Sequence, residues 1–458
     1  MKLKVNAKLD PKFQPLSVVI REMRQATKDN GQDIVIAVER NLGYTTTYKT
    51  RIFADGTGHD EENYGVVERI IKTLLWSKGG YKVFISGSKY IYERLSEEYR
   101  IGGKREFDYK FMSRVYENEF KVVYVENPAD FPEEKNISLA IGRNLDGCRI
   151  GFDAGGSDRK VSAVIDGETV YSEEVVWFPK TESDPDYHYN GILTAMKTAA
   201  SHMPRVDAIG VSSAGVYVDN KIMVASLFIK VSDEDFEKKV KNMYIDVAKE
   251  IGDVPVEVAN DGDVTALAGA MSLDDTNILG IAMGTSEAVG YVDKNGNLTG
   301  CLNELAFAPV DFNKDAMVDE WSGDYGCGVK YFSQDSVIKL APKAGIELDE
   351  KLSPAEKLKV VQELMEKDDP RAIDIYDTIG TYFGYAVAYY SVFYDIKHVL
   401  IMGRVTSGKG GVILLDKANE VLKTEFPEIY KKTTLNIPDE KARRVGQSVA
   451  AASLPKIK

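Results

Sequence analysis

The sequence predicts an α/β protein with more than one domain. Strand-like runs of alternating or continuous apolar residues are followed by helical runs along most of the chain. At 458 residues the chain is also longer than one hydrophobic core normally organises. Its 44% apolar and 28% charged residues are typical of folded proteins and exclude a disordered chain.

The composition also limits which binding partners and cellular compartments we expect. A net charge of −13 argues against a nucleic-acid-binding surface. The three cysteines, Cys148, Cys301 and Cys327, are far apart, so no disulfide framework is expected and a reducing compartment fits. No signal-like or membrane-spanning apolar run is evident, so we expect a cytoplasmic protein with no membrane partner.

The N-terminal part predicts strands at residues 34–38, 45–53 and 81–86. A helix lies between the last two, with one apolar face. That face is formed by Val67, Ile70, Ile71, Leu74 and Leu75. A similar order of strand, loop, strand, turn and helix follows Arg149. Residues 33–90 are therefore interpreted either as a degenerate repeat of the later unit or as an ordinary, unrelated α/β unit.

A loop rich in Asn and Pro places a domain boundary near Asn144. We predict three parts: an N-terminal α/β domain over 1–145, one lobe over 146–275 together with part of the C-terminal tail, and a second lobe over 276–440.

The most informative stretch runs from Arg149 to Gly167. Two strands enclose a polar loop that begins at Asp153 and contains Gly155, Gly156 and Ser157. Glycines let backbone N–H groups approach an anion closely, and a neighbouring carboxylate can hold a divalent cation through water. This pattern predicts binding of a nucleoside triphosphate with Mg²⁺.

Two further loops support a nucleotide site. Gly284, Thr285 and Ser286 lie between strands at 278–282 and 288–292, and Gly403 follows a strand at 398–402. Each loop alone is compatible with a plain turn. Together they predict two phosphate loops that clamp the β- and γ-phosphates, and a third loop against the adenosine.

Asp261 is the candidate general base. It follows a short strand and begins a helix, so its carboxylate is expected at the end of the sheet where ligands of α/β proteins bind. Phosphoryl transfer needs one carboxylate to accept the proton of the attacking hydroxyl. The alternative is that Asn260 or Asp261 simply caps the helix.

These motifs resemble the ROK family of sugar kinases and repressors over residues 148–425. Asp153–Ser157 is similar to the family's first phosphate loop, and 284–286 to its second. The resemblance implies an actin-like (ribonuclease H-like) ATPase fold of two lobes, preceded here by the N-terminal α/β domain. It also implies ATP and Mg²⁺ as cofactors, Asp261 as base, and Asn260 and Glu304 on the sugar.

Several positions depart from that pattern. Phe307 replaces the family's histidine, Leu227 a substrate asparagine, and Val329 a glutamate, while Cys327 alone remains of the zinc motif. No zinc is therefore expected. The acceptor pocket should be more apolar, which favours a deoxy, acylated or aryl-substituted sugar, or a different small molecule.

The leading hypothesis is an ATP-dependent kinase that acts on a hydroxyl of a sugar-like small molecule, with a homodimer allowed. A non-catalytic ROK-like ligand or nucleotide sensor is the alternative. A third hypothesis is a P-loop NTPase, since 403–410 fits the glycine and lysine spacing with Lys409, although the magnesium-binding Ser or Thr is missing. No helix-turn-helix is recognisable, so DNA binding is not expected.

Overall fold

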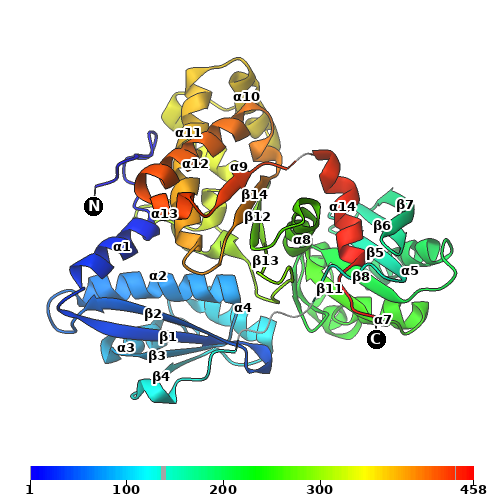
Figure 1. Cartoon of the computed structure of the whole chain (residues 1–458), viewed down its shortest axis with the longest axis horizontal. Helices are drawn as coiled ribbons and strands as arrows, with labels where there is room; N and C mark the ends of the chain where they lie inside the picture. The colour runs from blue at the N-terminus through cyan, green and yellow to red at the C-terminus, as the bar shows by residue number, and fades with distance from the viewer. Residues whose placement is uncertain (1, 136–140, 439, 458) are drawn as a thin grey trace. The chain divides into compact units, whose positions relative to one another are not determined.

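The computed structural model describes residues 2–135, 141–438 and 440–457, and confirms the α/β class (Figure 1). The chain divides into two compact units. Unit 1 comprises Met1–Ile137, Ile281–Val289 and Cys301–Ile437, and unit 2 comprises Ser138–Gly280, Gly290–Gly300 and Pro438–Lys458. The N-terminal region thus shares a unit with most of the C-terminal half. The three-part division by sequence remains a prediction.

The N-terminal part of unit 1 holds a four-stranded sheet in the order β2-β1-β3-β4. Its elements are α1 (Leu16–Ala26), β1 (Gly31–Glu39), β2 (Thr45–Phe53), α2 (Asp60–Lys78), β3 (Lys82–Ser86), α3 (Lys89–Glu98), α4 (Glu106–Tyr116) and β4 (Lys121–Tyr124). The acidic first turn of α2 and Lys78 in its last turn complement the helix dipole. The helix ends at Gly79, whose φ is +81°.

Strand directions distinguish this sheet from that of unit 2. β1 pairs antiparallel with β3, whereas the corresponding strands of unit 2, β5 (Cys148–Ala154) and β8 (Ala208–Ser213), pair parallel. Only two strands precede the helix here, and three precede it in unit 2. The strand directions therefore favour two unrelated α/β units over the suggested repeat.

The remainder of unit 1 contains most of a second sheet, with the order β13-β12-β14-β15, and a group of helices. The strands are β12 (Ile278–Met283), β13 (Glu287–Val292), β14 (His398–Met402) and β15 (Thr434–Asn436). The helices are α9 (Gln334–Leu340), α10 (Pro354–Glu366), α11 (Pro370–Tyr390), α12 (Lys409–Glu425) and α13 (Pro427–Tyr430). The buried α11 packs on α12 through Gly380 and Gly384, where a Cβ atom would lie 2.5 Å and 2.6 Å from atoms of α12.

Unit 2 is built on a five-stranded sheet in the order β11-β8-β5-β6-β7. The elements not yet given are β6 (Asp158–Ile165), β7 (Glu168–Val176), α5 (Pro185–Ala200), β9 (Val216–Val218), β10 (Lys221–Val224), α6 (Asp233–Asp235), α7 (Met243–Ile251), β11 (Val256–Asn260), α8 (Asp261–Leu273) and α14 (Glu440–Ala452). The strands β5, β8 and β11 are mutually parallel. Their apolar residues, with Ile192 and Met196 of α5, form the core.

The closing helix α14 packs directly on this sheet. A Cβ atom at Gly151 of β5 would lie 2.0 Å from the Ser448 carbonyl oxygen, and one at Gly210 of β8 would lie 1.6 Å from that of Ala451. Only glycine lets the backbones approach so closely. The C-terminal tail therefore fixes the strands whose ends carry the predicted site residues.

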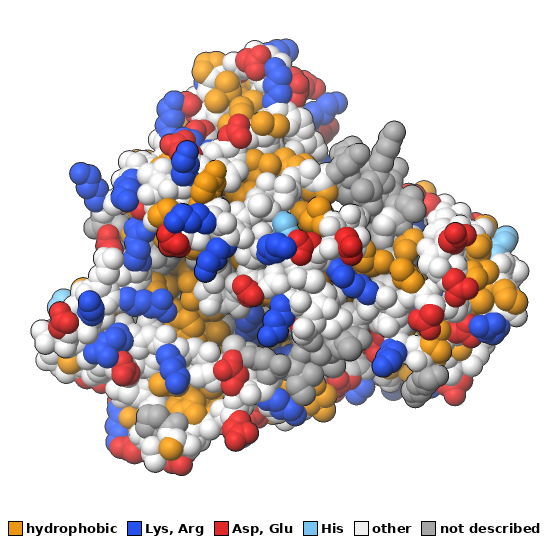
Figure 2. Space-filling view, viewed as in Figure 1, with side chains coloured by type: hydrophobic (Ala, Val, Ile, Leu, Met, Phe, Trp, Pro, Cys, Tyr) orange, Lys and Arg blue, Asp and Glu red, His pale blue; other side chains and the backbone are white. Residues whose placement is uncertain are grey.

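Two general properties follow from the described residues. Within 2–135, 141–438 and 440–457, no helix is both long enough and apolar enough to cross a bilayer. Figure 2 shows acidic and basic side chains interspersed over the face in view.

Candidate active site

The first group of predicted site residues lies at one edge of the sheet of unit 2. Asp153 is near the end of β5 and is in register with Ser212 of β8, while Asn260 ends β11 opposite Ser213. Because the three strands are parallel, their carboxyl ends meet at the same edge. Asp261 begins α8 at this edge. The fold thus brings Asp153, Asn260 and Asp261 together, as the sequence predicts.

The two aspartates affect one another electrostatically. Burial raises the pKa of Asp153 to about 6, and the charge of Asp261 adds to this increase. A hydrogen bond of 2.8 Å, which Asp153 Oδ1 accepts from the Ser212 hydroxyl, acts in the opposite direction and lowers the pKa. Burial also raises the pKa of Asp261, opposed by the Gly262 N–H and the charge of Lys180. A carboxylate that prefers its proton is suited to proton transfer.

Asn260 caps the N-terminus of α8, which was the alternative interpretation of this residue. Its Oδ1 accepts a hydrogen bond of 2.8 Å from the Gly262 N–H, and its Nδ2 donates one of 2.7 Å to the Gly215 carbonyl. An amide group has a further N–H and further lone pairs for a ligand. The sugar contact therefore remains a prediction, but the side chain is held rigidly in place.

Residues 155–157 form the turn between β5 and β6. A Cβ atom at Gly155 would lie 2.7 Å from the Asp158 carbonyl, and one at Gly156 would lie 2.9 Å from Cε of Lys180. Ser157 is exposed and its hydroxyl lies 3.3 Å from Asp158 Oδ2. The predicted phosphate loop is thus an open, glycine-dependent turn next to Asp153.

The sequence did not point to the residues that hold this turn. The buried indole of Trp177 donates a hydrogen bond of 2.8 Å to the Gly155 carbonyl, and the Trp177 N–H donates one of 3.1 Å to the Ser157 carbonyl. Lys180 follows three residues later. A single Trp and Lys beyond a strand carry no local signal, because their role depends on the pairing of β6 with β7.

The second group of predicted residues lies in unit 1. Gly284, Thr285 and Ser286 form the turn between β12 and β13, closed by a hydrogen bond of 2.9 Å from the Gly284 N–H to the Ser286 carbonyl. Arg404 Nη2 lies 3.3 Å from the Thr285 hydroxyl. Gly403 has a φ of +100°, and a Cβ atom there would lie 2.3 Å from the Met283 carbonyl. The second and third loops therefore lie side by side.

Glu304 precedes a short 3-10 turn, and its N–H donates a hydrogen bond of 2.8 Å to the Trp76 carbonyl. Next to it is Glu287, which is 4% exposed, and whose pKa is raised well above its usual value by burial and by the charge of Glu304. Gly328 leaves room for this carboxyl, since a Cβ atom there would lie 2.4 Å from Glu287 Oε2. Sequence reasoning missed Glu287, which directly follows the second loop.

The departures from the ROK pattern are part of the core of each unit. Phe307 is buried among aromatic rings, with ring-centroid distances of 4.4 Å to Trp76, 5.2 Å to Trp321 and 5.7 Å to Phe107. Leu227 is fully buried in the core of unit 2. Aromatic and aliphatic contacts therefore occupy positions for which the family resemblance implies polar side chains.

Cys327 has a surrounding unsuited to zinc. Burial raises the pKa of its thiol to about 12, against the charges of Lys72 and Arg69, and its Sγ lies 3.9 Å from Asp324 Oδ2. A cysteine binds zinc as a thiolate. The positive charges of Lys72 and Arg69 also disfavour a zinc ion beside this thiol. Within the described parts of the chain, no group of three or more His, Cys, Asp or Glu side chains is arranged to hold a metal. The absence of zinc remains a prediction.

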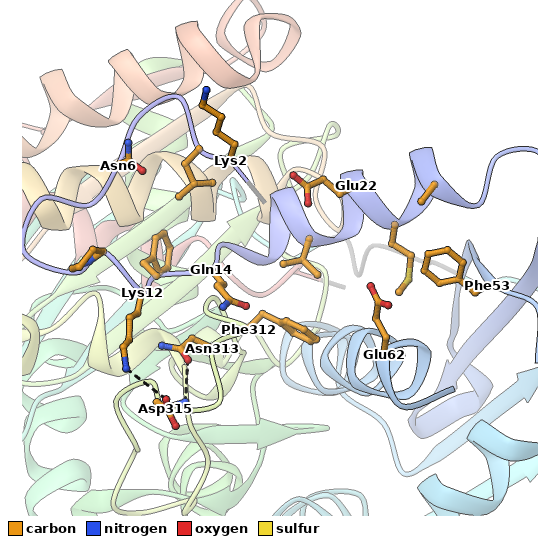
Figure 3. A pocket seen from close by; sticks show the side chains of 16 residues that line it. Lys2, Asn6, Lys12, Gln14, Glu22, Phe53, Glu62, Phe312, Asn313 and Asp315 are labelled. Carbon is orange, nitrogen blue, oxygen red and sulfur yellow. Dashed lines mark hydrogen bonds and ion pairs between the residues drawn. The ribbon is translucent and has the colours of Figure 1, made fainter. Parts of the chain in front are cut away.

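Lys409 and a hollow in unit 1 are two further features. The Lys409 ammonium is 2.8 Å from Asp368 Oδ1 and 3.2 Å from the Glu366 carbonyl. A hollow of about 940 Å³ in unit 1 is lined by residues of the N-terminal arm and of α1, among others. Figure 3 shows this lining and the ion pair between Lys12 and Asp315, whose charged atoms are 3.8 Å apart. The hollow contains none of the predicted site residues.

The family follows from comparison with known proteins. A model of the ROK family matches residues 149–449, which is more than half of the chain. The chain belongs to the ROK family. The family predicted from the loop motifs is thereby confirmed, together with the actin-like ATPase fold.

Solved structures give the same fold. A ROK family transcriptional regulator, a homologue of the E. coli MLC protein, is 19% identical, with 68% of this chain and 79% of that chain covered and a TM-score of 0.53. A ROK hexokinase from Thermus thermophilus is 17% identical, with 66% and 97% covered and a TM-score of 0.50. Comparison with curated proteins finds no match. The family includes both kinases and regulators, so membership alone does not decide whether this ROK protein is catalytic.

Proposed function

We propose that this ROK protein is an ATP-dependent kinase that transfers the γ-phosphate to a hydroxyl of a sugar-like substrate. The observation that carries the proposal is the pair of carboxylates at one sheet edge of unit 2. Asp153 and Asp261 both have raised pKa values and lie beside a glycine turn. A non-catalytic protein gains nothing from keeping two partly desolvated carboxylates next to each other.

In the proposed reaction Asp261 accepts the proton of the acceptor hydroxyl, whose oxygen attacks the γ-phosphorus while ADP leaves. Asn260 orients the start of α8 and thus the Asp261 carboxylate, since its cap fixes Gly262. The turns at 155–157 and 284–286, together with Gly403, are the proposed nucleotide contacts. Backbone N–H groups in such turns can bind phosphate oxygens without side chains.

The residues present fit a magnesium ion held through water by Asp153. Its carboxylate adjoins the turn at Gly155 and Gly156, and glycines have no side chain that would keep an anion and its cation from the backbone. Bound Mg²⁺ would supply charge neutralisation for the phosphates. Ser212 orients Asp153 for this role through its hydroxyl.

The acceptor is proposed to be less polar than a free hexose. Phe307 lies in an aromatic cluster and Leu227 in the core, so two hydrogen-bonding side chains implied by the resemblance are lost. A deoxy, acylated or aryl-substituted sugar compensates with apolar contacts what it lacks in hydroxyl groups. Glu304 is retained as the proposed contact to a hydroxyl.

A ligand sensor without catalysis is the second candidate. It is favoured by the same altered acceptor positions and by the similarity to a ROK regulator. In that case a sugar or nucleotide would bind, but Asp261 would have no proton to accept. The P-loop hypothesis has less support, since Lys409 is held by Asp368.

The test is ADP release with Mg-ATP across a panel of unmodified, deoxy, N-acyl and aryl sugars. We expect at least one substrate to exceed the substrate-free rate clearly, and Asp261→Asn to remove that excess. Calorimetry with the same panel completes the experiment. Binding of ATP or sugar without turnover would replace the kinase proposal with the sensor, whereas loss of turnover in Lys409→Ala but not in Asp261→Asn would favour the P-loop.

A further inference from the structure

Residues 177–180 form a short segment that is fixed against the first phosphate loop. We call this segment the strap. Trp177 is 1% exposed and binds the Gly155 carbonyl with its indole and the Ser157 carbonyl with its backbone N–H. The strap therefore begins on the loop itself. Neither contact depends on any of the predicted site side chains.

The next two residues of the strap are held by the first turn of α5. The Phe178 N–H donates a hydrogen bond of 3.0 Å to the Tyr187 hydroxyl. His188, which is fully buried, has its Nε2 2.9 Å from the Pro179 carbonyl and its Nδ1 3.2 Å from the Asp184 carbonyl. Three consecutive strap residues are thus anchored to rigid elements. Lys180 follows directly and is exposed.

The Lys180 side chain lies over the glycine turn. A Cβ atom at Gly156 would be 2.9 Å from its Cε and 3.0 Å from its Nζ. The ammonium charge also acts on Asp261. Within the part of the chain that the structure describes, no carboxylate lies within ion-pair distance of Lys180. The ammonium group thus lies at the glycine turn, its charge acts on the proposed base, and its hydrogen-bond donors are available.

We propose that Lys180 is a phosphate-binding residue that contacts the γ-phosphate during its transfer. The inference rests on the proposed function. Its Nζ donates a hydrogen bond to a non-bridging oxygen of the γ-phosphoryl group. The bond from the acceptor oxygen to phosphorus forms, the bond to the β–γ bridging oxygen breaks, the hydroxyl proton goes to Asp261, and the electron pair leaves with ADP. A cation at this place offsets the negative charge on the transferred group.

The position of Lys180 also explains the need for glycine at residue 156. Any side chain there would displace the ammonium from the turn. The Lys180 charge also favours the ionised form of Asp261, which is the form that can accept a proton. The strap thus couples the phosphate loop and the base in one unit.

The experiment compares Lys180→Met with Lys180→Arg and with Lys249→Met, an exposed lysine of α7 that pairs with Asp246. Calorimetry measures binding of ATP, AMP and inorganic triphosphate to the full chain. Lys180→Met is expected to weaken ATP and triphosphate about 10- to 100-fold and to leave AMP unchanged, as for loss of a charge-assisted hydrogen bond. Lys180→Arg should retain most of the affinity, and Lys249→Met all of it.

A kinetic measurement separates this inference from the proposed function. With an active substrate, Lys180→Met should lower kcat more than it raises the KM of the acceptor. Equal loss of ATP and AMP affinity, or no loss, would overturn the role of Lys180 while kinase activity stands. Selective loss of triphosphate affinity in a protein without turnover would support Lys180 and overturn the kinase. A wild-type protein that binds neither ATP nor triphosphate would overturn both.

Discussion

Two aspartates of this protein, the buried Asp324 in unit 1 and the partly buried Asp153 in unit 2, differ in their electrostatic surroundings. Burial alone would raise the pKa of Asp324, but the charges of Arg69 and Lys72 hold it below its usual value. The pKa of Asp153 is raised to about 6, because burial acts on it without a cation in ion-pair contact within the described chain. The charge of the Asp324 carboxylate is thus balanced by Arg69 and Lys72, whereas the Asp153 carboxylate is left without an ion-pair partner among the described residues and can interact with a ligand.

Asp324 belongs to a balanced cluster of ions. Three cations and three anions pair within it, all with side chains no more than 5% exposed. They are Arg69, Lys72, Arg105, Glu68, Asp108 and Asp324. The cluster joins α2 and α4 to the segment just before Cys327, where the family resemblance implies zinc ligands. We interpret it as a cross-link made of ion pairs, whereas the carboxylates of Asp153 and Asp261 in unit 2 are the ones that we propose for catalysis.

The largest expected effect is on the carboxylate assigned to proton transfer. Asp261→Asn removes the base but keeps the shape and the cap of α8, so kcat should fall about 10²- to 10⁴-fold. ATP affinity should stay within a few-fold, because the phosphate loop is intact. Turnover and calorimetry on the same preparation measure both. An unchanged kcat would exclude Asp261 as the base. It would also contradict the idea that the carboxylates of unit 2 differ from Asp324 by acting in catalysis.

Asp324→Asn is expected to destabilise the protein by about 3–5 kcal/mol, because Arg69 and Lys72 are left buried without their shared counter-charge. Urea unfolding followed by fluorescence measures the change. The matched control is Glu61→Gln, which removes an ion pair with Arg94 that is largely exposed, and should cost less than about 1 kcal/mol. Similar costs for both variants would contradict the cross-link.

Asp153→Asn should stabilise the folded protein, in contrast to Asp324→Asn. The folded state raises the pKa of Asp153 from 3.8 to about 6, so the cost of its ionisation to folding builds up between these two pH values and is complete above pH 6; below 3.8 both states are protonated without cost. The variant should therefore be more stable than wild type by about 2–3 kcal/mol at pH 8 and nearly equal to it near pH 3.5. Urea unfolding at both pH values tests this, and a loss of stability at pH 8 would contradict it. Activity and Mg²⁺ dependence should be lost in the same variant.

The smallest effect is expected from Lys409→Ala. Its ion pair with Asp368 is solvent-exposed, so stability should change by less than about 1 kcal/mol and turnover by less than about twofold. Lys423→Ala in the last turn of the same helix is the control. A loss of turnover confined to Lys409→Ala would identify 403–410 as a true phosphate loop.

Secondary structure was predicted correctly where it depends on residues that are neighbours in the sequence. The strands at 45–53 and 398–402 have the predicted bounds, and Asn260 caps α8 as its residue type favours. The apolar run from Ile373 to Ile396 predicts one long helix, but α11 ends at Tyr390 and the next residues form turns, among which only Tyr394 and Ile396 are buried. The pattern from Val412 to Leu422 predicts a second helix, and α12 begins three residues earlier, at Lys409.

The sequence by itself determined the α/β class and the resemblance to the ROK family, and it predicted the loops that we propose for the nucleotide, because glycine turns after strands are local and leave residue-type signals. Tertiary structure alone decided that Lys180 lies over Gly156, that His188 anchors the strap, and that Lys72 meets Asp108 and Asp324. These contacts join residues far apart in the chain, and charge or ring type at one position does not identify its partner. The pKa of each carboxylate depends on such partners, so the direction of its shift follows only from the fold, whereas the roles proposed for Asp153 and Asp261 were already predicted by the sequence.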